Sequence, residues 1–124
     1  MTYITDVLTP QDLKKRYRTL ALHFHPDKGG SVDIMKQINT EYSLWQQGFT
    51  SRPRYIHEVQ IGNMIYVNSS RAVVIEVQDK VFKAKSLETK REMYFDKETG
   101  YAQFNLKFRA YINHDYYDML DNMN

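Results

Sequence analysis

The chain has 124 residues, 42% of them hydrophobic and 26% charged, which suffices for one ordinary domain or two small ones with a buried core. Its net charge of +2 is too small to require a nucleic-acid or anionic-membrane partner, and the basic excess lies in residues 1–54, with eight Lys/Arg against five Asp/Glu. The absence of cysteine excludes disulfides, cysteine nucleophiles and thiolate zinc sites, and it fits a reducing compartment.

The first eight residues have no apolar run of signal-peptide length, and no stretch of the chain approaches a membrane span. We therefore expect a soluble cytoplasmic protein without a membrane partner. A helix is predicted from Pro10 to about Phe24, because Thr9 can cap it and Pro10 suits its first position. Its apolar face is formed by residues at helical spacing: Leu13, Tyr17, Leu20, Ala21 and Phe24.

A tight loop follows this helix. Pro26 cannot continue a helix, and Gly29 and Gly30 permit the positive φ angles that a turn needs. Ser31 is the expected cap of a second helix that runs to about Gln47, with Gly48 at its C-terminal end. The apolar stripe of this helix consists of Met35, Ile38, Tyr42 and Trp45. Two helices joined by so short a loop should pack antiparallel, stripe against stripe.

Residues 50–55 contain a proline and no apolar pattern, and we interpret them as a linker. Beyond them the hydrophobic period changes from that of a helix to that of strands. Five strands are predicted, at residues 64–67, 71–77, 81–86, 91–95 and 101–110. In the last of these, Phe104, Leu106, Phe108 and Ala110 alternate with polar residues, which predicts one buried face. Residues 114–124 could form a short acidic helix or a frayed tail.

The predicted fold class is therefore α+β: an antiparallel helical hairpin followed by a small antiparallel β barrel or sandwich of about five strands. We expect the hairpin in residues 1–49, the linker in residues 50–55, and the β module with its acidic end in residues 56–124. The hairpin core should contain Leu13, Tyr17, Leu20, Phe24, Ile38, Tyr42 and Trp45. The eight residues before the hairpin can supply one helical turn or an extended cover, so we expect the β half to cover the rest of this stripe.

The loop between the helices carries the tripeptide His25-Pro26-Asp27, followed by Lys28-Gly29-Gly30. A basic helix precedes it, and the second helix carries Met35, an Ile38-Asn39 pair and Tyr42 in register. Over residues 9–49 this arrangement resembles the J-domain of the DnaJ family of co-chaperones. The Lys-Gly-Gly extension is also similar to the J-domains of polyomavirus T antigens, which hints at a viral or phage source and a host cytoplasm. The chain departs from the family in lacking room for its first helix and in lacking a fourth.

The resemblance implies a co-chaperone that docks on a DnaK-type (seventy-kilodalton heat-shock) chaperone and stimulates ATP hydrolysis by that partner. The residues that the resemblance assigns to docking are His25, Pro26, Asp27, Lys14, Lys15, Arg18 and Lys28. The cations would meet an acidic surface, and Asp27 would accept hydrogen bonds from an arginine of the chaperone. The β module would recruit an unknown client or assembly partner through residues 56–124, or brace the hairpin. The resemblance implies neither enzymatic activity nor a cofactor.

Two alternatives remain at this stage. The tripeptide can be a structural turn or a degenerate docking site, because Asp and Pro are good loop residues in their own right. The β module can instead bind nucleic acid or protein, because small barrels often bind nucleic acid through basic and aromatic residues. The residues of those types are Arg71, Lys80, Lys83, Lys85, Lys90, Arg91, Tyr66, Tyr94 and Tyr101, and interleaved acidic residues weaken this reading. The four histidines lack metal-ligand spacing, so no metal is expected.

Overall fold

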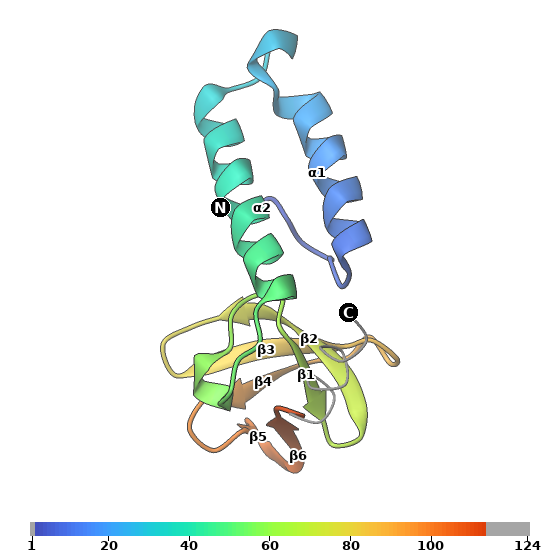
Figure 1. Ribbon diagram of the computed structural model, residues 1–124, viewed down its shortest axis with the longest axis vertical. Helices are drawn as coiled ribbons and strands as arrows, with labels where there is room; N and C mark the ends of the chain where they lie inside the picture. Colours follow the sequence, from blue (N-terminus) through green and yellow to red (C-terminus); the bar gives the residue numbers. More distant parts are fainter. Residues whose placement is uncertain (1, 114–124) are drawn as a thin grey trace.

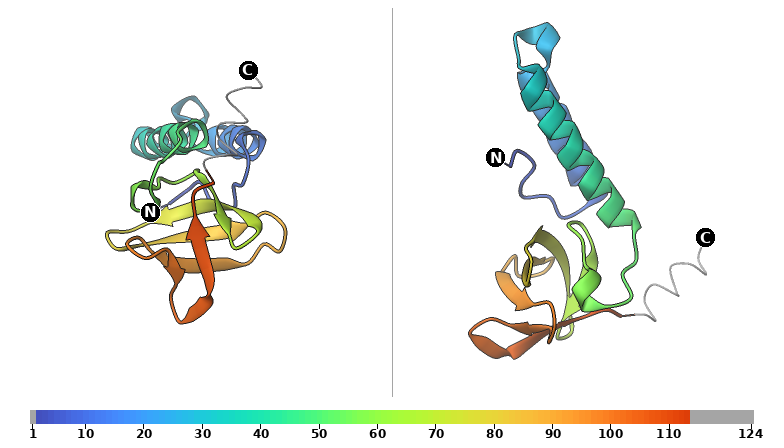
Figure 2. Two further views of the ribbon diagram at one scale, coloured as in Figure 1. Left: turned by 60° about the horizontal axis from the view of Figure 1, so that its bottom comes forward. Right: turned by 90° about the vertical axis from the view of Figure 1, so that its left-hand side faces the viewer.

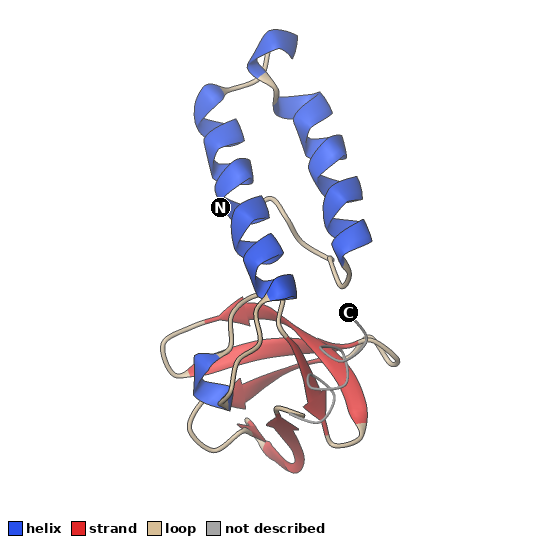
Figure 3. Ribbon diagram, in the orientation of Figure 1, coloured by secondary structure: helices blue, strands red, loops and turns tan. Residues whose placement is uncertain are grey.

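The computed structural model describes residues 2–113, in which a helical hairpin stands on a β barrel (Figure 1). Figure 3 shows that the hairpin is helical and the barrel is built of strands, with one short helix beside it. The helices are α1 (Pro10–Phe24), η1 (Pro26–Lys28), α2 (Val32–Thr50) and η2 (Ile56–Glu58). The strands are β1 (Met64–Val67), β2 (Ser70–Val77), β3 (Val81–Ser86), β4 (Glu92–Asp96), β5 (Tyr101–Ala102) and β6 (Asn105–Tyr111). The α+β class expected from the sequence is confirmed.

Both long helices begin at the predicted caps. The Thr9 hydroxyl accepts a hydrogen bond from the Asp12 amide at 3.1 Å, and Pro10 occupies the first helical position. The Ser31 hydroxyl accepts from the Ile34 amide at 3.3 Å. Each cap satisfies an amide that the first turn of a helix leaves without a partner. The two ends of the loop are therefore fixed by local hydrogen bonds.

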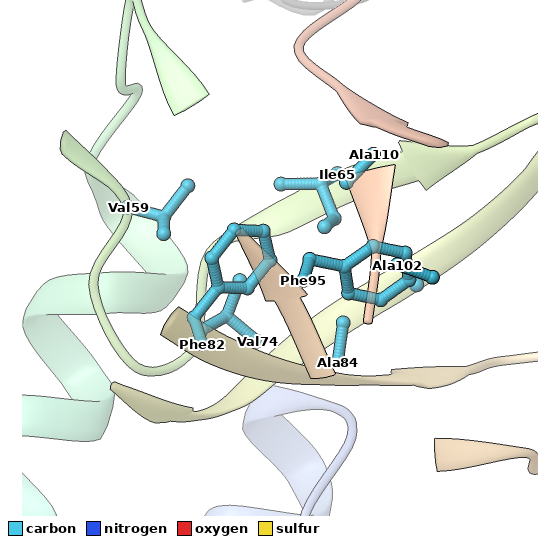
Figure 4. Packing of buried hydrophobic residues seen from close by; sticks show 9 residues of the cluster. Val59, Ile65, Val74, Phe82, Ala84, Phe95, Ala102 and Ala110 are labelled. Carbon is cyan, nitrogen blue, oxygen red and sulfur yellow. The ribbon is translucent and has the colours of Figure 1, made fainter. Parts of the chain in front are cut away.

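The sheet is a closed antiparallel barrel in the order β1-β2-β3-β4-β5-β6, with β1 paired to β6 (Figure 2). The sequence predicted either a barrel or a sandwich, and the closed sheet shows that it is a barrel. Closure also removes the exposed sheet edges that invite aggregation. The interior is apolar and includes the stacked rings of Phe82 and Phe95, whose centroids are 5.5 Å apart. Figure 4 shows these rings among the smaller side chains Val59, Ile65, Val74, Ala84, Ala102 and Ala110.

The region predicted as one strand over residues 101–110 is a tight hairpin of β5 and β6. Its turn contains Phe104, which has a positive φ of 64° and is fully exposed. Leu106 is also exposed, so the predicted buried face is wrong at these two positions. Ala102 and Ala110 are buried in the barrel instead, with Phe108 packed against them. Alternation alone could not reveal that the chain reverses direction within this segment. The predicted acidic helix or tail at 114–124 lies outside the described residues.

A second apolar core lies between the hairpin and the barrel. Leu13, Ile38 and Trp45 are buried there together with Val73 from β2. Partly buried residues of the barrel half also pack against this core: Ile61, Ile75 and Leu87. Strand β2 serves both cores, because successive side chains of a strand point to opposite faces: Ala72 and Val74 face the barrel interior, and Val73 faces the hairpin. The two parts of the chain thus share buried surface.

The N-terminal segment, residues 2–8, completes this second core as an extended strap. Ile4 and Val7 are each only 1% exposed, and Tyr3 and Leu8 pack beside them. The strap lies on the same side of the hairpin as the barrel (Figure 2). It is held by Glu41 of α2, whose Oε1 accepts the amides of Tyr3 and Ile4, both at 2.9 Å. The strap therefore occupies apolar surface of the hairpin without forming a helix.

The end of α2 meets the barrel by close backbone contact. A Cβ on Gly48 would lie 1.6 Å from the carbonyl oxygen of Ile61, and one on Gly62 would lie 2.9 Å from that of Trp45. The side-chain Nδ2 of the buried Asn63 donates to the Gly48 carbonyl at 2.7 Å. Gly48 is therefore a contact residue inside α2, which continues to Thr50, and it is not the helix cap that the sequence predicted.

Candidate functional site

The tripeptide His25-Pro26-Asp27 forms the tip of the hairpin, at the end away from the barrel (Figure 1). Its backbone is ordered by hydrogen bonds to the His25 carbonyl, which accepts the amides of Lys28 at 2.9 Å and Gly30 at 3.0 Å. Pro26 occupies the first position of η1, where a missing amide donor has no cost. Because the backbone groups of the turn hydrogen-bond to one another, the side chains of the tip remain available to a partner.

His25 fixes the turn through its own ring. Its Nδ1 accepts the Asp27 amide at 3.2 Å, while Nδ1 also lies 3.6 Å from Asp27 Oδ2. The hydrogen bond requires an unprotonated Nδ1, which places the proton of the neutral ring on Nε2, whereas an ion pair would require the charged ring. We assign the hydrogen-bonded form, because it caps η1. The Asp27 side chain is 89% exposed, so its carboxylate faces solvent.

The two glycines after the tripeptide serve different purposes. Gly29 has a φ of 82° with open space around its Cα, so it is needed for its backbone conformation. Gly30 has an ordinary φ, but a Cβ there would lie 2.0 Å from the Phe24 carbonyl oxygen. The tip therefore folds back against the end of α1, and only glycine at position 30 allows that approach.

The predicted cations Lys14, Lys15 and Arg18 are all exposed on α1, and Lys28 is exposed at the end of η1. Lys14 and Arg18 are four residues apart and so lie on one face of the helix. Leu22 continues this face toward the tip and is 61% exposed. Leu22 is absent from the residues predicted from the sequence, although its spacing of four residues from Arg18 is a signal that could have found it.

The predicted hairpin core residues lie between or beside the two helices. Leu13, Leu20, Ile38 and Trp45 are buried, and Tyr17, Phe24 and Tyr42 are partly buried. The Tyr17 hydroxyl donates to Asn39 Oδ1 at 2.7 Å, and the rings of Tyr17 and Tyr42 are 4.5 Å apart. This contact joins the middle of α1 to α2 and sets the spacing of the helices below the tip.

Two of the barrel cations considered for nucleic-acid binding have acidic partners. Lys83 Nζ lies 3.6 Å from Glu92 and 5.2 Å from the centre of the Tyr94 ring, and Lys85 Nζ lies 3.8 Å from Asp6. Burial lowers the pKa of Lys83, but the neighbouring Tyr94, Glu76 and Glu92 outweigh it and raise that pKa overall. These lysines therefore form no free basic face. Across residues 2–113 no group of three metal-binding side chains occurs, and no helix is long and apolar enough to cross a membrane.

Short stretches of this chain are similar to known J-domain proteins. DnaJ protein homolog 2 of Allium porrum is 50% identical over 36 residues, which are 29% of this chain and 9% of that protein. The small t antigen of Budgerigar fledgling disease virus is 53% identical over 32 residues, 26% of this chain and 22% of the antigen. Human DnaJ homolog subfamily B member 14 is 51% identical over 37 residues, 27% of this chain and 10% of that protein.

These similarities confirm the resemblance to DnaJ homologues and polyomavirus T antigens in the J-domain region, and the C-terminal half has no match. The chain spans less than a quarter of the length of each of these relatives. No family model matches the chain, and no solved structure matches it. The comparisons therefore concern the hairpin and leave the barrel to be interpreted from its own residues.

Proposed function

We propose that this chain is a co-chaperone that docks on a DnaK-type chaperone through the hairpin tip and α1, and that docking stimulates ATP hydrolysis by the chaperone. The observation that carries the proposal is the exposed, ordered tripeptide at the tip, in a region similar to DnaJ homologues. The chain itself performs no chemistry in this proposal. Docking shifts the conformational balance of the partner, as any ligand with unequal affinity for two states does.

The charges of the hairpin fit this role. Lys14, Lys15 and Arg18 present positive charge along α1, which would steer an acidic surface of the chaperone into place and fix its orientation. The exposed Asp27 carboxylate would accept charge-assisted hydrogen bonds from an arginine of the chaperone. The short loop holds both features on one rigid hairpin.

The position of the barrel supports the same proposal. The barrel packs against the base of the hairpin and leaves the tip uncovered (Figure 1). We propose that it braces the hairpin, because Val73, Ile61 and Leu87 join the apolar stripe that two helices alone would expose. The strap supplies the rest of the cover. The chain would work beside a cytoplasmic chaperone, which agrees with its lack of cysteine.

Single-turnover ATP hydrolysis by a purified DnaK-type chaperone tests the proposal. We expect the wild-type chain to accelerate hydrolysis and the His25→Gln variant to lose the effect, because glutamine cannot reproduce the ring nitrogen that caps η1. His57→Gln is the matched control: it makes the same substitution at an exposed histidine of η2 and should leave stimulation intact. Binding without acceleration, or acceleration that survives His25→Gln, would contradict the proposal.

A further inference from the structure

One end of the barrel opens into an apolar cavity of about 110 Å³. It is lined by apolar residues of the barrel, among them Val67, Ala72, Met93 and Phe108, and by the polar residues Ser70, Ser86, Thr89 and Arg91. Alanine at two lining positions, 72 and 84, leaves space that larger side chains would fill. Engineered apolar cavities of about 150 Å³ stay dry and bind benzene-sized molecules, so this cavity is of the size that takes an aliphatic side chain.

The β5–β6 hairpin, which supplies Phe108 to the cavity, also carries the two most exposed large hydrophobic residues of the described chain. Leu106 is 76% exposed and Phe104 is fully exposed, two and four residues before Phe108 on the β5–β6 hairpin. Because side chains alternate along a strand, Leu106 is on the same side of β6 as Phe108, which lines the cavity. Phe104 also has a positive φ of 64°, which a bulky residue adopts rarely. Backbone strain of this kind gathers at binding sites.

The charge at the cavity is positive. Arg91 is the one charged residue among those that line it, whereas Lys107 lies between Leu106 and Phe108 on β6 and therefore on the opposite face of the strand. Within the described residues, Arg91 takes part in no salt bridge. An apolar cavity beside an unpaired cation is complementary to an apolar side chain flanked by a carboxylate.

We propose that this cavity, with Phe104 and Leu106 at its rim, is a docking site for an acidic peptide segment that inserts an aliphatic side chain into the barrel. The segment lies along the β5–β6 hairpin, with a carboxylate near Arg91 and its aliphatic side chain in the cavity. The inference deepens the proposed function, on which it rests for biological meaning, because it names where and by what chemistry the barrel holds a client.

Fluorescence anisotropy with fluorescein-labelled peptides tests the site directly. We expect a nonapeptide of alternating aspartate and leucine to bind, and matched peptides with serine for leucine or lysine for aspartate to bind at least ~tenfold more weakly. Phe104→Asn, Leu106→Thr, Arg91→Gln and the cavity-filling Ser70→Leu should each weaken binding. Leu44→Gln, at an exposed residue of α2, is the control and should not.

Thermal unfolding of each variant separates a lost site from a lost fold. Phe104→Asn should be at least as stable as the wild type, because asparagine tolerates a positive φ and the phenyl ring touches solvent only. Equal affinity for all three peptides, or no effect of Phe104→Asn and Ser70→Leu, would overturn the inference. Binding of a labelled oligothymidylate at this site in place of the acidic peptide would also overturn it.

The chaperone assay distinguishes the two proposals. Phe104→Asn should keep full stimulation of ATP hydrolysis, because the tip lies at the other end of the molecule (Figure 1). Stimulation without peptide binding would refute the barrel site alone. Peptide binding without stimulation would refute the co-chaperone function and leave the barrel site standing as a peptide-binding module.

Discussion

Replacing Glu41 should release the N-terminal strap from the hairpin. Glu41 is only 8% exposed, and its Oε1 accepts hydrogen bonds from the amides of Tyr3 and Ile4. Its Oε2 accepts from Gln37 Nε2 at 3.0 Å. In Glu41→Ala, the two amides lose their acceptor beneath the strap. A hydrogen bond to a charged group contributes about 1.5–3 kcal/mol, so the loss of two predicts a decrease of about 3–6 kcal/mol in the free energy of unfolding.

The variant Glu41→Gln separates the charge from the acceptor. Its carbonyl oxygen can still accept both strap amides, so we expect a loss of about 1–2 kcal/mol, consistent with neutral hydrogen bonds replacing charged ones. Urea unfolding measures both losses. Hydrogen exchange should show faster exchange at the amides of residues 3 and 4 in the alanine variant and near-native rates in the glutamine variant. Unchanged exchange at these amides, or a loss of less than ~1 kcal/mol in the free energy of unfolding of Glu41→Ala, would refute the role of Glu41 in holding the strap.

Three further predictions concern the junction, the tip and a barrel turn. A fragment that ends after α2 should show weaker helical circular dichroism per residue than the same region in the whole chain, because it lacks Val73 and its neighbours; a well-folded fragment would disprove bracing. Gly30→Ala should abolish stimulation of the chaperone, whereas Gly29→Ala should lower stability by about 1 kcal/mol and retain part of the activity; equal activities would contradict the separate roles. Hydrogen bonds from the Thr99 and Glu98 amides lower the pKa of Asp96. The Asp96→Asn variant should therefore be less stable than the wild type above pH 3.8, and this difference in stability should vanish as the pH falls further. A difference between the two acid unfolding curves that stays constant with pH would exclude this contribution of Asp96.

The local signals in the sequence predicted the elements well. Thr9, Pro10 and Ser31 act within one turn of themselves, so the starts of α1 and α2 follow from residue chemistry. The strands at residues 64–67 and 81–86 also match their predicted bounds, because short β-rich runs are flanked there by turn residues. The loop between the helices was equally visible, since its proline and glycines constrain the backbone without help from the rest of the chain.

Features that depend on distant contacts could not be predicted in this way. Gly48 is read as a helix cap in isolation, and only the carbonyl of Ile61 explains why it lies inside α2. Glu41 is an ordinary exposed helix residue by sequence, and it becomes a buried acceptor only because the strap crosses it. The β5–β6 turn at Phe104 cannot be seen in the alternating pattern, because the period of a strand is the same before and after the chain reverses direction.

The backbone contact at Gly48 and Gly62 joins the hairpin rigidly to the barrel. A flexible linker between two binding sites allows many separations and sets only an effective concentration. Here the 19 residues of α2 form a strut of roughly 28 Å that is anchored to the barrel through Gly48, Gly62 and Asn63. The span between tip and barrel is therefore a fixed length. Anything held at the far end of the barrel would be presented to a partner of the tip at one distance and one orientation.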